Sequence, residues 1–306
     1  MKKVLLIVNP IAGSRRAAMK SAARISTALK DANYSVEMFE TRRRNDAFQR
    51  AKEENVREFV AVCVLGGDGT LNEVINGVSE KKIPVLPVPL GLSNVLAKEI
   101  GASTDSSSVV ETLKTGSSVE IDLLEATFIT EKSTEKKKRV FAAMAGVGFD
   151  ADVVTRIARS RRKGLGFAGY VPSIVKSLFS PSHPFIVSAD GKRLTENATY
   201  LVVGNGTYYG GPFHITTKAS MTDGKMDVLY GERFSSLEVI MFYGSVLCRS
   251  HLRHRGIRHL QCKTLEVDIK EGDGASVHID GEAVGRIPLS IRVIPRGLRL
   301  LVPKRK

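Results

Sequence analysis

Residues 60–78 combine a buried-strand pattern, a glycine-rich turn and a helix pattern without a break. Val60–Leu65 is entirely apolar, which is typical of a strand covered on both faces of a parallel sheet. Gly66–Thr70 then predicts a turn, and the apolar residues beyond it recur at helical spacing: Leu71, Val74, Ile75 and Val78. A buried strand that passes through such a turn into a helix favours an open α/β sheet.

The same alternation of strand and helix runs through the first 118 residues, so we predict a doubly wound α/β domain over residues 1–118. Ser14 is expected to cap the first helix. The predicted strands are 4–8, 36–39, 60–65 and 83–88, and the predicted helices are 15–29, 46–54, 71–78 and 95–100.

The pattern changes near residue 119, where short strands with Gly, Asp and Pro turns predict an antiparallel β-sandwich over residues 119–289. Residues 290–306 are expected to return to the first domain, and residues 131–138 to form a solvated hairpin tip. The predicted strands are 119–129, 139–145, 185–188, 200–204, 226–230, 265–269, 277–279 and 289–293, and the predicted helices are 151–162, 171–179 and 237–247.

Length and charge narrow the classes of protein further. A chain of 306 residues suggests about two domains, and no apolar run approaches the roughly 18–20 residues that span a bilayer. The net charge of +14 favours an anionic partner, whether nucleic acid, a phosphorylated ligand or an acidic membrane surface. The three cysteines are far apart, which argues against a disulfide framework and fits a reducing compartment.

The glycine-rich segment Gly66–Glu73 (GGDGTLNE) has the features of a phosphate-binding turn. Glycines let backbone N–H groups approach a phosphate closely, and the following helix adds unpaired donors and the positive end of its dipole. Asp68 is suited to hold Mg²⁺ or to orient groups around a transferred phosphoryl. The alternative is a purely structural Gly-Asp-Gly turn.

GGDGT is the signature of the superfamily of diacylglycerol, sphingoid-base and NAD kinases, and this chain most resembles the bacterial diacylglycerol-kinase-like lipid kinases. The resemblance extends along almost the entire chain, in the order of the family's motifs. The matching segments are Asn9-Pro10-Ile11-Ala12-Gly13, Thr41, Gly66–Val74, Asp122, Gly146–Asp150, Gly204-Asn205-Gly206 through Gly210-Gly211, Asp223-Gly224 and Asp280-Gly281-Glu282.

The resemblance implies a Rossmann-like, NAD-kinase-like first domain, a β-sandwich second domain and a nucleotide cleft between them. It implies ATP and Mg²⁺, a lipid acceptor with an apolar slot in the second domain, and a possible homodimer. Glu282 corresponds to the proposed proton acceptor and Asp68 organises the metal–phosphate end. The implied nucleotide contacts are Asn9, Pro10, Ile11, Ala12, Gly13, Thr41, Gly66, Gly67, Asp68, Gly69, Thr70, Leu71, Asn72, Gly91, Ser93 and Asn94; the implied structural Mg²⁺ ligands are Ser220, Asp223 and Lys225.

Two segments depart from the family pattern. The usual G-T-x-N-D turn is here Gly91-Leu92-Ser93-Asn94-Val95, and Ser93 and Asn94 are equally suited to capping the next helix. In the D-D-G turn, Thr222 replaces the first Asp, and Lys225 stands where the family has an apolar residue. A nucleotide- or lipid-sensing pseudokinase, and a kinase of a soluble acceptor as in NAD kinases, therefore remain alternatives.

The sequence thus predicts an ATP-dependent lipid kinase that phosphorylates a hydroxyl of a lipid such as diacylglycerol, cytoplasmic and peripheral at the inner membrane surface. Basic runs at 156–163 and 249–259 are either solvated faces or docking sites for anionic headgroups. Few aromatic residues interleave these runs, so nucleic acid is not expected as a partner. The G-x-G-x-x-G segment at 164–169 follows no strand and is not expected to bind a dinucleotide.

Overall fold

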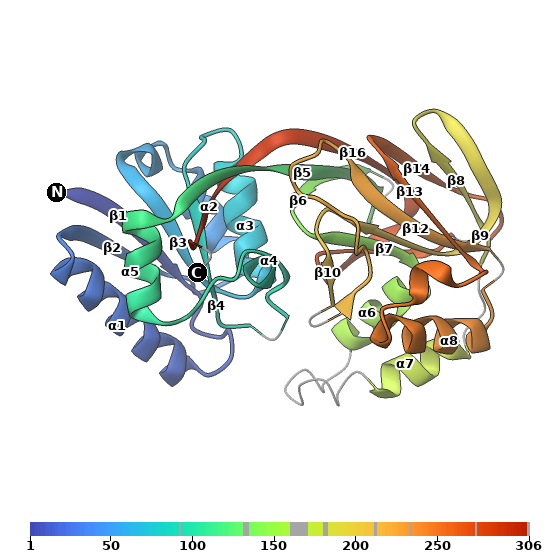
Figure 1. The fold of residues 1–306 in the computed structure, drawn as a ribbon, viewed down its shortest axis with the longest axis horizontal. Coiled ribbons are helices and arrows are strands. Elements are labelled where there is room, and N and C mark those ends of the chain that lie inside the picture. Colours follow the sequence, from blue (N-terminus) through green and yellow to red (C-terminus); the bar gives the residue numbers. More distant parts are fainter. Residues whose placement is uncertain are drawn as a thin grey trace. The chain divides into compact units, whose positions relative to one another are not determined.

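A computed structural model describes residues 1–91, 93–130, 135–159, 171–179, 183–210, 213–232, 234–272 and 274–304. The chain divides into two compact units. The first comprises Met1–Leu123 and Pro295–Lys306, and the second comprises Leu124–Ile294. Two long strands, β5 (Ser117–Ile129) and β16 (Glu282–Val302), each contribute residues to both units (Figure 1).

The first unit is built on a parallel sheet in the order β2-β1-β3-β4, with the end of β16 beside β4. Residues Val4–Val8 of β1 are fully buried, as expected for a central strand with helices on both faces. The strands are β1 (Lys2–Val8), β2 (Tyr34–Glu40), β3 (Phe59–Gly66) and β4 (Val85–Pro89).

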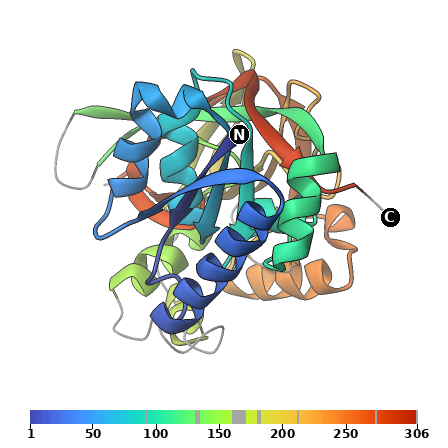
Figure 2. The same cartoon turned by 90° about the vertical axis from the view of Figure 1, so that its left-hand side faces the viewer.

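Two pairs of helices cover this sheet: α1 (Arg15–Asp31) packs with α5 (Ser106–Thr115), and α2 (Asp46–Lys52) packs with α3 (Asp68–Val78). Figure 2 shows the parallel strands between the two pairs. The short elements η1 (Glu54–Glu58) and α4 (Val95–Glu99) complete the unit. The core on the α1–α5 side joins alternate sheet residues to the apolar stripes of both helices, among them Leu6, Leu65, Ile25, Leu29 and Val109.

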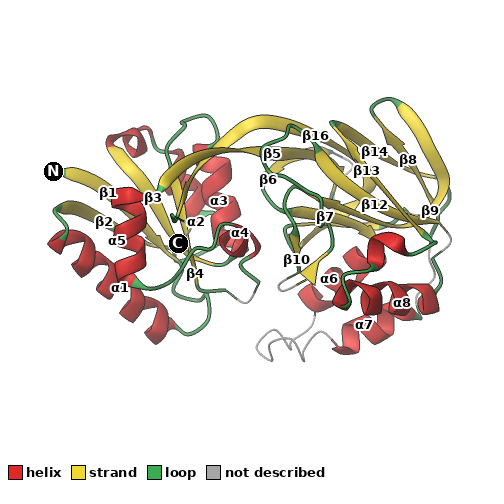
Figure 3. Ribbon diagram, in the orientation of Figure 1, coloured by secondary structure: helices red, strands yellow, loops and turns green. Residues whose placement is uncertain are grey.

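The second unit is rich in antiparallel strands (Figure 3). Six of them pair in a closed ring, β9-β7-β15-β16-β14-β8 and back to β9, so that their inner faces enclose one apolar core. Closure leaves no free edge within the ring. The strands are β6 (Lys136–Phe141), β7 (Met144–Gly148), β8 (Phe185–Ala189), β9 (Lys192–Gly204), β10 (Tyr208–Tyr209), β11 (Phe213–His214), β12 (Met226–Glu232), β13 (Ile257–Cys262), β14 (Thr264–Ile269) and β15 (Ser276–Ile279).

Helices in this unit are α6 (Phe149–Arg159), α7 (Val171–Leu178), α8 (Ser236–Leu247) and the short η3 (His251–Arg253). They lie along one side of the strands in Figure 1. Helix α8 begins with a capping box, in which Ser235 and Glu238 each bond the other's backbone N–H. Among the described residues, no helix is both long and apolar enough to cross a membrane.

Several local predictions were wrong. Helix α5 was not predicted, although Asp105 caps it by accepting a hydrogen bond from Ser108 N at 2.9 Å. The strand predicted at 139–145 is two strands, β6 and β7, that pair with different partners. Strand β13, which contains the end of the basic run at 249–259, was not predicted. Ser14 precedes α1, but its side chain makes no capping bond.

Asp122 fastens β5 to the final part of β16. Its side chain is 2% exposed, and Oδ1 accepts a hydrogen bond of 2.9 Å from the backbone N–H of Arg296. Arg296 adopts a left-handed conformation with φ of 52°, which this bond helps to hold. The Asp122 carboxylate is therefore a structural anchor.

We expect Asp122→Ala to lower the free energy of unfolding by about 1–3 kcal/mol, because the hydrogen bond between the buried carboxylate and the Arg296 N–H is lost. Urea denaturation followed by circular dichroism measures this change. Glu120→Ala, which removes an ion-pairing carboxylate from the same strand, serves as control and should cost less than about 1 kcal/mol. Equal effects of the two substitutions would contradict the anchoring role.

Candidate functional site

Two turns meet at the carboxyl ends of β3 and β4. Leu90 N donates to Gly66 O at 2.8 Å, and the backbones of Gly67 and Gly91 lie against each other. A Cβ on Gly91 would come within 2.8 Å of Gly67 Cα and 2.9 Å of Asn94 Oδ1. Position 91 therefore needs glycine, because a side chain there would push the turns apart, whereas a Cβ on Gly67 would meet Gly91 Cα at 3.4 Å, an ordinary contact.

Asp68 ties these turns together. Its Oδ1 accepts a hydrogen bond of 2.7 Å from Val95 N, at the start of α4. Asn94 was an alternative candidate to cap α4, but its side chain makes no capping bond there. Instead, Asn94 Oδ1 accepts from Gly91 N at 3.0 Å and its amide donates to Gly91 O, which closes the 91–94 turn on itself. Leu92 lies outside the described residues.

The first amides of α3 also lie at this place. The first intrahelical bond is donated by Leu71 N to Gly67 O at 3.1 Å. The amides of Asp68, Gly69 and Thr70 precede it and have no partner within the helix. Together with the positive end of the helix dipole, they form the kind of cradle that binds phosphate.

The turn after β1 reaches the same helix. Asn9 Nδ2 donates to Thr70 Oγ1 at 2.8 Å, and Asn9 Oδ1 accepts from Ile11 N at 3.1 Å. Gly13 has φ of 86°, a conformation that favours glycine. Ile11 is 80% exposed, so its side chain is available to a ligand rather than to the core.

The remaining predicted nucleotide contacts divide into two groups. Thr41 follows β2, with its N–H bonded to Val8 O at 2.9 Å, and so belongs to the same edge of the sheet. Leu71 and Asn72 are buried in the unit, where Asn72 accepts from Asn76. The structure thus brings the turns after β1, β2, β3 and β4 to one edge of the sheet. Leu71 and Asn72 do not lie on that surface, because their side chains are buried.

Glu282 lies in the second unit, directly after the Asp280-Gly281 turn of the β15–β16 hairpin. Both turn residues have positive φ, 47° and 75°, as in a tight two-residue hairpin turn. Asp280 Oδ1 accepts from Met144 N at 2.9 Å, which pins the turn to β7. Glu282 Oε2 pairs with Arg139 Nη1 at 2.7 Å, and the two side chains are 35% and 17% exposed.

A buried polar network lies behind this hairpin and was not foreseen. Asp150 accepts hydrogen bonds from the hydroxyls of Tyr209 and Tyr243, the latter at 3.0 Å, and pairs with His278 Nε2 at 2.5 Å. Burial alone would raise the pKa of Asp150, but His278 and the two hydroxyls outweigh it and hold the pKa below its usual value. Burial also raises the pKa of Tyr209 and Tyr243 well above 10, so both stay neutral donors.

The predicted metal ligands Ser220, Asp223 and Lys225 lie on an exposed turn before β12. Asp223 Oδ1 accepts from Lys225 N at 3.0 Å, and Gly224 has φ of 73°. The donors that this turn offers, one carboxylate and backbone carbonyls, are oxygen ligands of the type that Mg²⁺ prefers. No cluster of three His, Cys, Asp or Glu side chains suited to a metal occurs among the residues with described coordinates.

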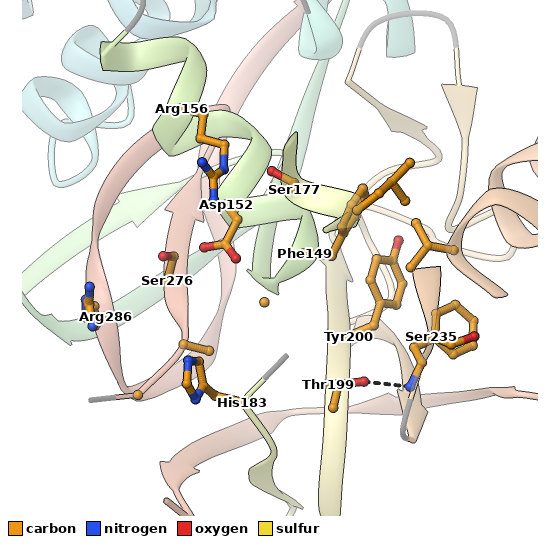
Figure 4. A pocket seen from close by; sticks show the side chains of 16 residues that line it. Phe149, Asp152, Arg156, Ser177, His183, Thr199, Tyr200, Ser235, Ser276 and Arg286 are labelled. Carbon is orange, nitrogen blue, oxygen red and sulfur yellow. Dashed lines mark hydrogen bonds between the residues drawn. The ribbon is translucent and has the colours of Figure 1, made fainter. Parts of the chain in front are cut away.

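A cavity of about 440 Å³ lies between the helices and strands of the second unit (Figure 4). Its walls are partly aromatic, from Phe149, Tyr200 and Phe234, but they also carry charges, in contrast to the apolar slot that the sequence suggested. The Ser177 hydroxyl lines it and has no hydrogen-bond partner. The charged or titratable lining residues are Asp152, Arg156, His183 and Arg286.

Some predicted features lie outside the described residues. These are part of the basic run, residues 160–163, the G-x-G-x-x-G segment at 164–169, Gly211 and the first half of the hairpin tip, residues 131–134. Arg139 and His278 could not be paired with Glu282 and Asp150 from sequence, because each pair is separated by more than 120 residues. The sequence around Arg139 also contains no motif that would mark this residue as part of a site.

Each of the two units matches a known protein-family model. The family model "Diacylglycerol kinase catalytic domain" matches residues 3–126, and the model "YegS C-terminal NAD kinase beta sandwich-like domain" matches residues 143–302. The second match spans more than half of the chain. The predicted fold class, an α/β domain followed by a β-sandwich domain, is confirmed.

Individual relatives agree with the family models. The chain is 24% identical to the diacylglycerol kinase of Bacillus subtilis (strain 168), covering 100% of this chain and 98% of that protein, and 25% identical to the diacylglycerol kinase of Mycobacterium tuberculosis (strain ATCC 25618 / H37Rv), covering 99% and 96%. A crystal structure of a Bacillus anthracis diacylglycerol kinase has the same fold, with a TM-score of 0.69, 18% identity and coverage of 98% and 97%. Yeast NADH kinase is more distant, with a TM-score of 0.55, 12% identity and coverage of 100% and 84%. The chain therefore belongs to the diacylglycerol-kinase-like lipid kinase family, whose members are phosphotransferases with an alcohol acceptor.

Proposed function

We propose that this protein transfers the γ-phosphoryl group of ATP to a primary hydroxyl of a lipid such as diacylglycerol. The observation that carries the proposal is the pair of turns at the ends of β3 and β4, joined by Gly67, Gly91 and Asp68. Such a joined pair places the first amides of α3 where they can donate hydrogen bonds to phosphate oxygens. Membership of the family supports the reaction class.

In this proposal, the turns after β1, β2, β3 and β4 hold the nucleotide. The amides of Asp68, Gly69 and Thr70 bind phosphate oxygens, while Asn9 fixes Thr70 and so the first turn of α3. Mg²⁺ neutralises phosphate charge when it is bound, and Asp68 is the carboxylate of this edge that suits it. The Asp68–Val95 bond keeps that carboxylate in one orientation.

Glu282 is the proposed base. It takes the proton of the acceptor hydroxyl while the hydroxyl oxygen bonds to the γ-phosphorus and the bond to the β–γ bridging oxygen breaks, releasing ADP. Arg139 Nη1 lies 2.7 Å from Glu282 Oε2 and so holds the carboxylate in one orientation. The Asp280 bonds and the Asp150–His278 network keep the hairpin that carries Glu282 rigid.

Purified protein with Mg²⁺, labelled ATP and a panel of lipids in mixed micelles tests the proposal. We expect label on a lipid that bears a free hydroxyl, diacylglycerol first. Nucleotide binding without transfer to any acceptor would instead favour a sensor, and transfer only to a soluble acceptor such as NAD would favour an NAD-kinase-like activity.

Glu282→Gln should lower kcat by about 10²–10⁴-fold, because the amide accepts no proton. Nucleotide affinity, measured by calorimetry, and thermal stability should change little. Glu196→Gln is the matched control, since Glu196 also accepts from an arginine Nη1 in the second unit, at 2.6 Å from Arg193. Wild-type turnover in Glu282→Gln would place the base elsewhere.

Asp68 has two separable roles, and two substitutions distinguish them. Asp68→Asn keeps an oxygen that accepts from Val95 N but removes the charge, whereas Asp68→Ala removes both. If the charge organises metal and phosphate, both variants should lose at least about tenfold in nucleotide affinity and about 100-fold in turnover. Asp105→Ala, which removes the cap of α5, should lower stability by about 1 kcal/mol without affecting nucleotide binding. Wild-type kinetics for Asp68→Asn would limit Asp68 to a capping role.

A further inference from the structure

Helix α8 is apolar on two opposite sides. Glu238 is its only charged residue among Ser236–Leu247, and it is engaged in the capping box. Val239, Phe242 and Val246 are buried against the unit, whereas Leu237 and Leu247 are 65% and 72% exposed. A helix that is apolar all round is normally covered on every side, so the outer side of α8 lacks its cover.

The exposed residues of α8 form one stripe rather than a scatter. Leu237, Ile240, Met241 and Leu247 follow each other at intervals of three, one and six residues, which places them on one face. Ile240 is 54% and Met241 55% exposed. Stripes of this kind on a protein surface mark an interaction site, whereas single exposed apolar residues do not.

Helix α7 also exposes apolar side chains, and it buries polar ones in their place. Ser173 and Ser177 are buried, at 7% and 4% exposure, while Val175 is 46% exposed and Phe179, just after the helix, is 83% exposed. Ser177 faces the cavity of Figure 4. Six of the twelve exposed large apolar side chains among the described residues therefore belong to these two segments. Both helices lie along the lower edge of the second unit in Figure 1 and in the turned view of Figure 2.

Positive charge flanks this apolar surface. Arg249, Arg253 and Arg255 follow α8 directly, and all three are exposed. None of them forms an ion pair with a carboxylate among the residues that the structure describes. An apolar stripe bordered by arginines is the pattern of a surface that lies in the headgroup region of an anionic bilayer.

We propose that these outer faces, called the α7–α8 face, dock onto the surface of a bilayer that contains anionic phospholipids. Its apolar residues enter the headgroup region while the arginines bind lipid phosphates. The inference deepens the proposed function, on which it rests, because a lipid kinase must reach an acceptor held in a bilayer. The α7–α8 face consists of Val175, Phe179, Leu237, Ile240, Met241 and Leu247.

A second copy of the chain is a poorer occupant of this face. A two-fold interface is self-complementary, so it would bring the arginines of both copies to one contact. A net charge of +14 on each copy adds to that repulsion. An anionic bilayer brings no second set of arginines to the contact, and it attracts the positive net charge of the chain.

Vesicle sedimentation with the full chain tests the proposal. Binding to vesicles with 30% phosphatidylglycerol in phosphatidylcholine should exceed binding to pure phosphatidylcholine, and should weaken at high salt. Leu237→Glu with Ile240→Glu should reduce the partition coefficient at least tenfold. Leu194→Glu with Ile269→Glu is the matched control, because it adds the same charge at exposed apolar positions on β9 and β14, 36% and 41% exposed, and should leave binding unchanged.

The chain contains no tryptophan, which allows a local reporter of insertion. Leu237→Trp should show a blue shift of its emission when anionic vesicles are added, and Leu194→Trp should show none. Equal shifts at both positions, or unchanged sedimentation of the Leu237/Ile240 double variant, would overturn the proposal. A wild-type dimer in sedimentation velocity that this double variant dissociates would overturn it as well.

Transfer activity separates this inference from the proposed function. With a short-chain acceptor dispersed in detergent, the Leu237/Ile240 double variant should phosphorylate at the wild-type rate, and with the same acceptor in anionic vesicles it should be at least tenfold slower. A wild-type protein that binds vesicles but transfers no phosphoryl group would refute the kinase and leave the docking surface standing. A wild-type protein that transfers but does not bind anionic vesicles would refute the docking surface alone.

Discussion

The backbones of Gly67 and Gly91 lie in contact, and the other features of the first unit's candidate site depend on that contact. It leaves no room for a side chain at Gly91, and it brings Val95 N within reach of Asp68. The turn after β4 is thereby held against the start of α3, while Asn9 holds it from the β1 side. Amides fixed in this way need little reorganisation when charge arrives, which is how a binding site for phosphate also becomes a catalytic one.

In the second unit, rigidity comes from closure and from buried polar contacts. The ring of strands fixes the β15–β16 hairpin at both flanks, and Asp280 Oδ1 accepts hydrogen bonds from the amides of Ala143 and Met144, where β7 begins. The Asp150 carboxylate forms hydrogen bonds with side chains from three separate elements. These bonds compensate the free energy that burial of its charge costs. Such a network is costly to break, which keeps the residues around Glu282 in one arrangement.

Local chemistry explains what the sequence revealed and what it did not. The strand, turn and helix around Gly66–Thr70 could be predicted because apolar period and glycine placement act within a few residues. Glu282 was found through a motif, but its partner Arg139 is 143 positions away and depends on tertiary pairing. The inverted burial of Ser177 on α7 could not be foreseen, because helix patterns assume that apolar residues face inward.

The most direct test of this account is a crystal structure with a non-hydrolysable ATP analogue and Mg²⁺. We expect the β- and γ-phosphates to accept hydrogen bonds from the amides of residues 68–70, with Asp68 still bonded to Val95 N. A nucleotide bound away from this edge of the sheet, or a triphosphate held only by side chains of the second unit, would contradict it.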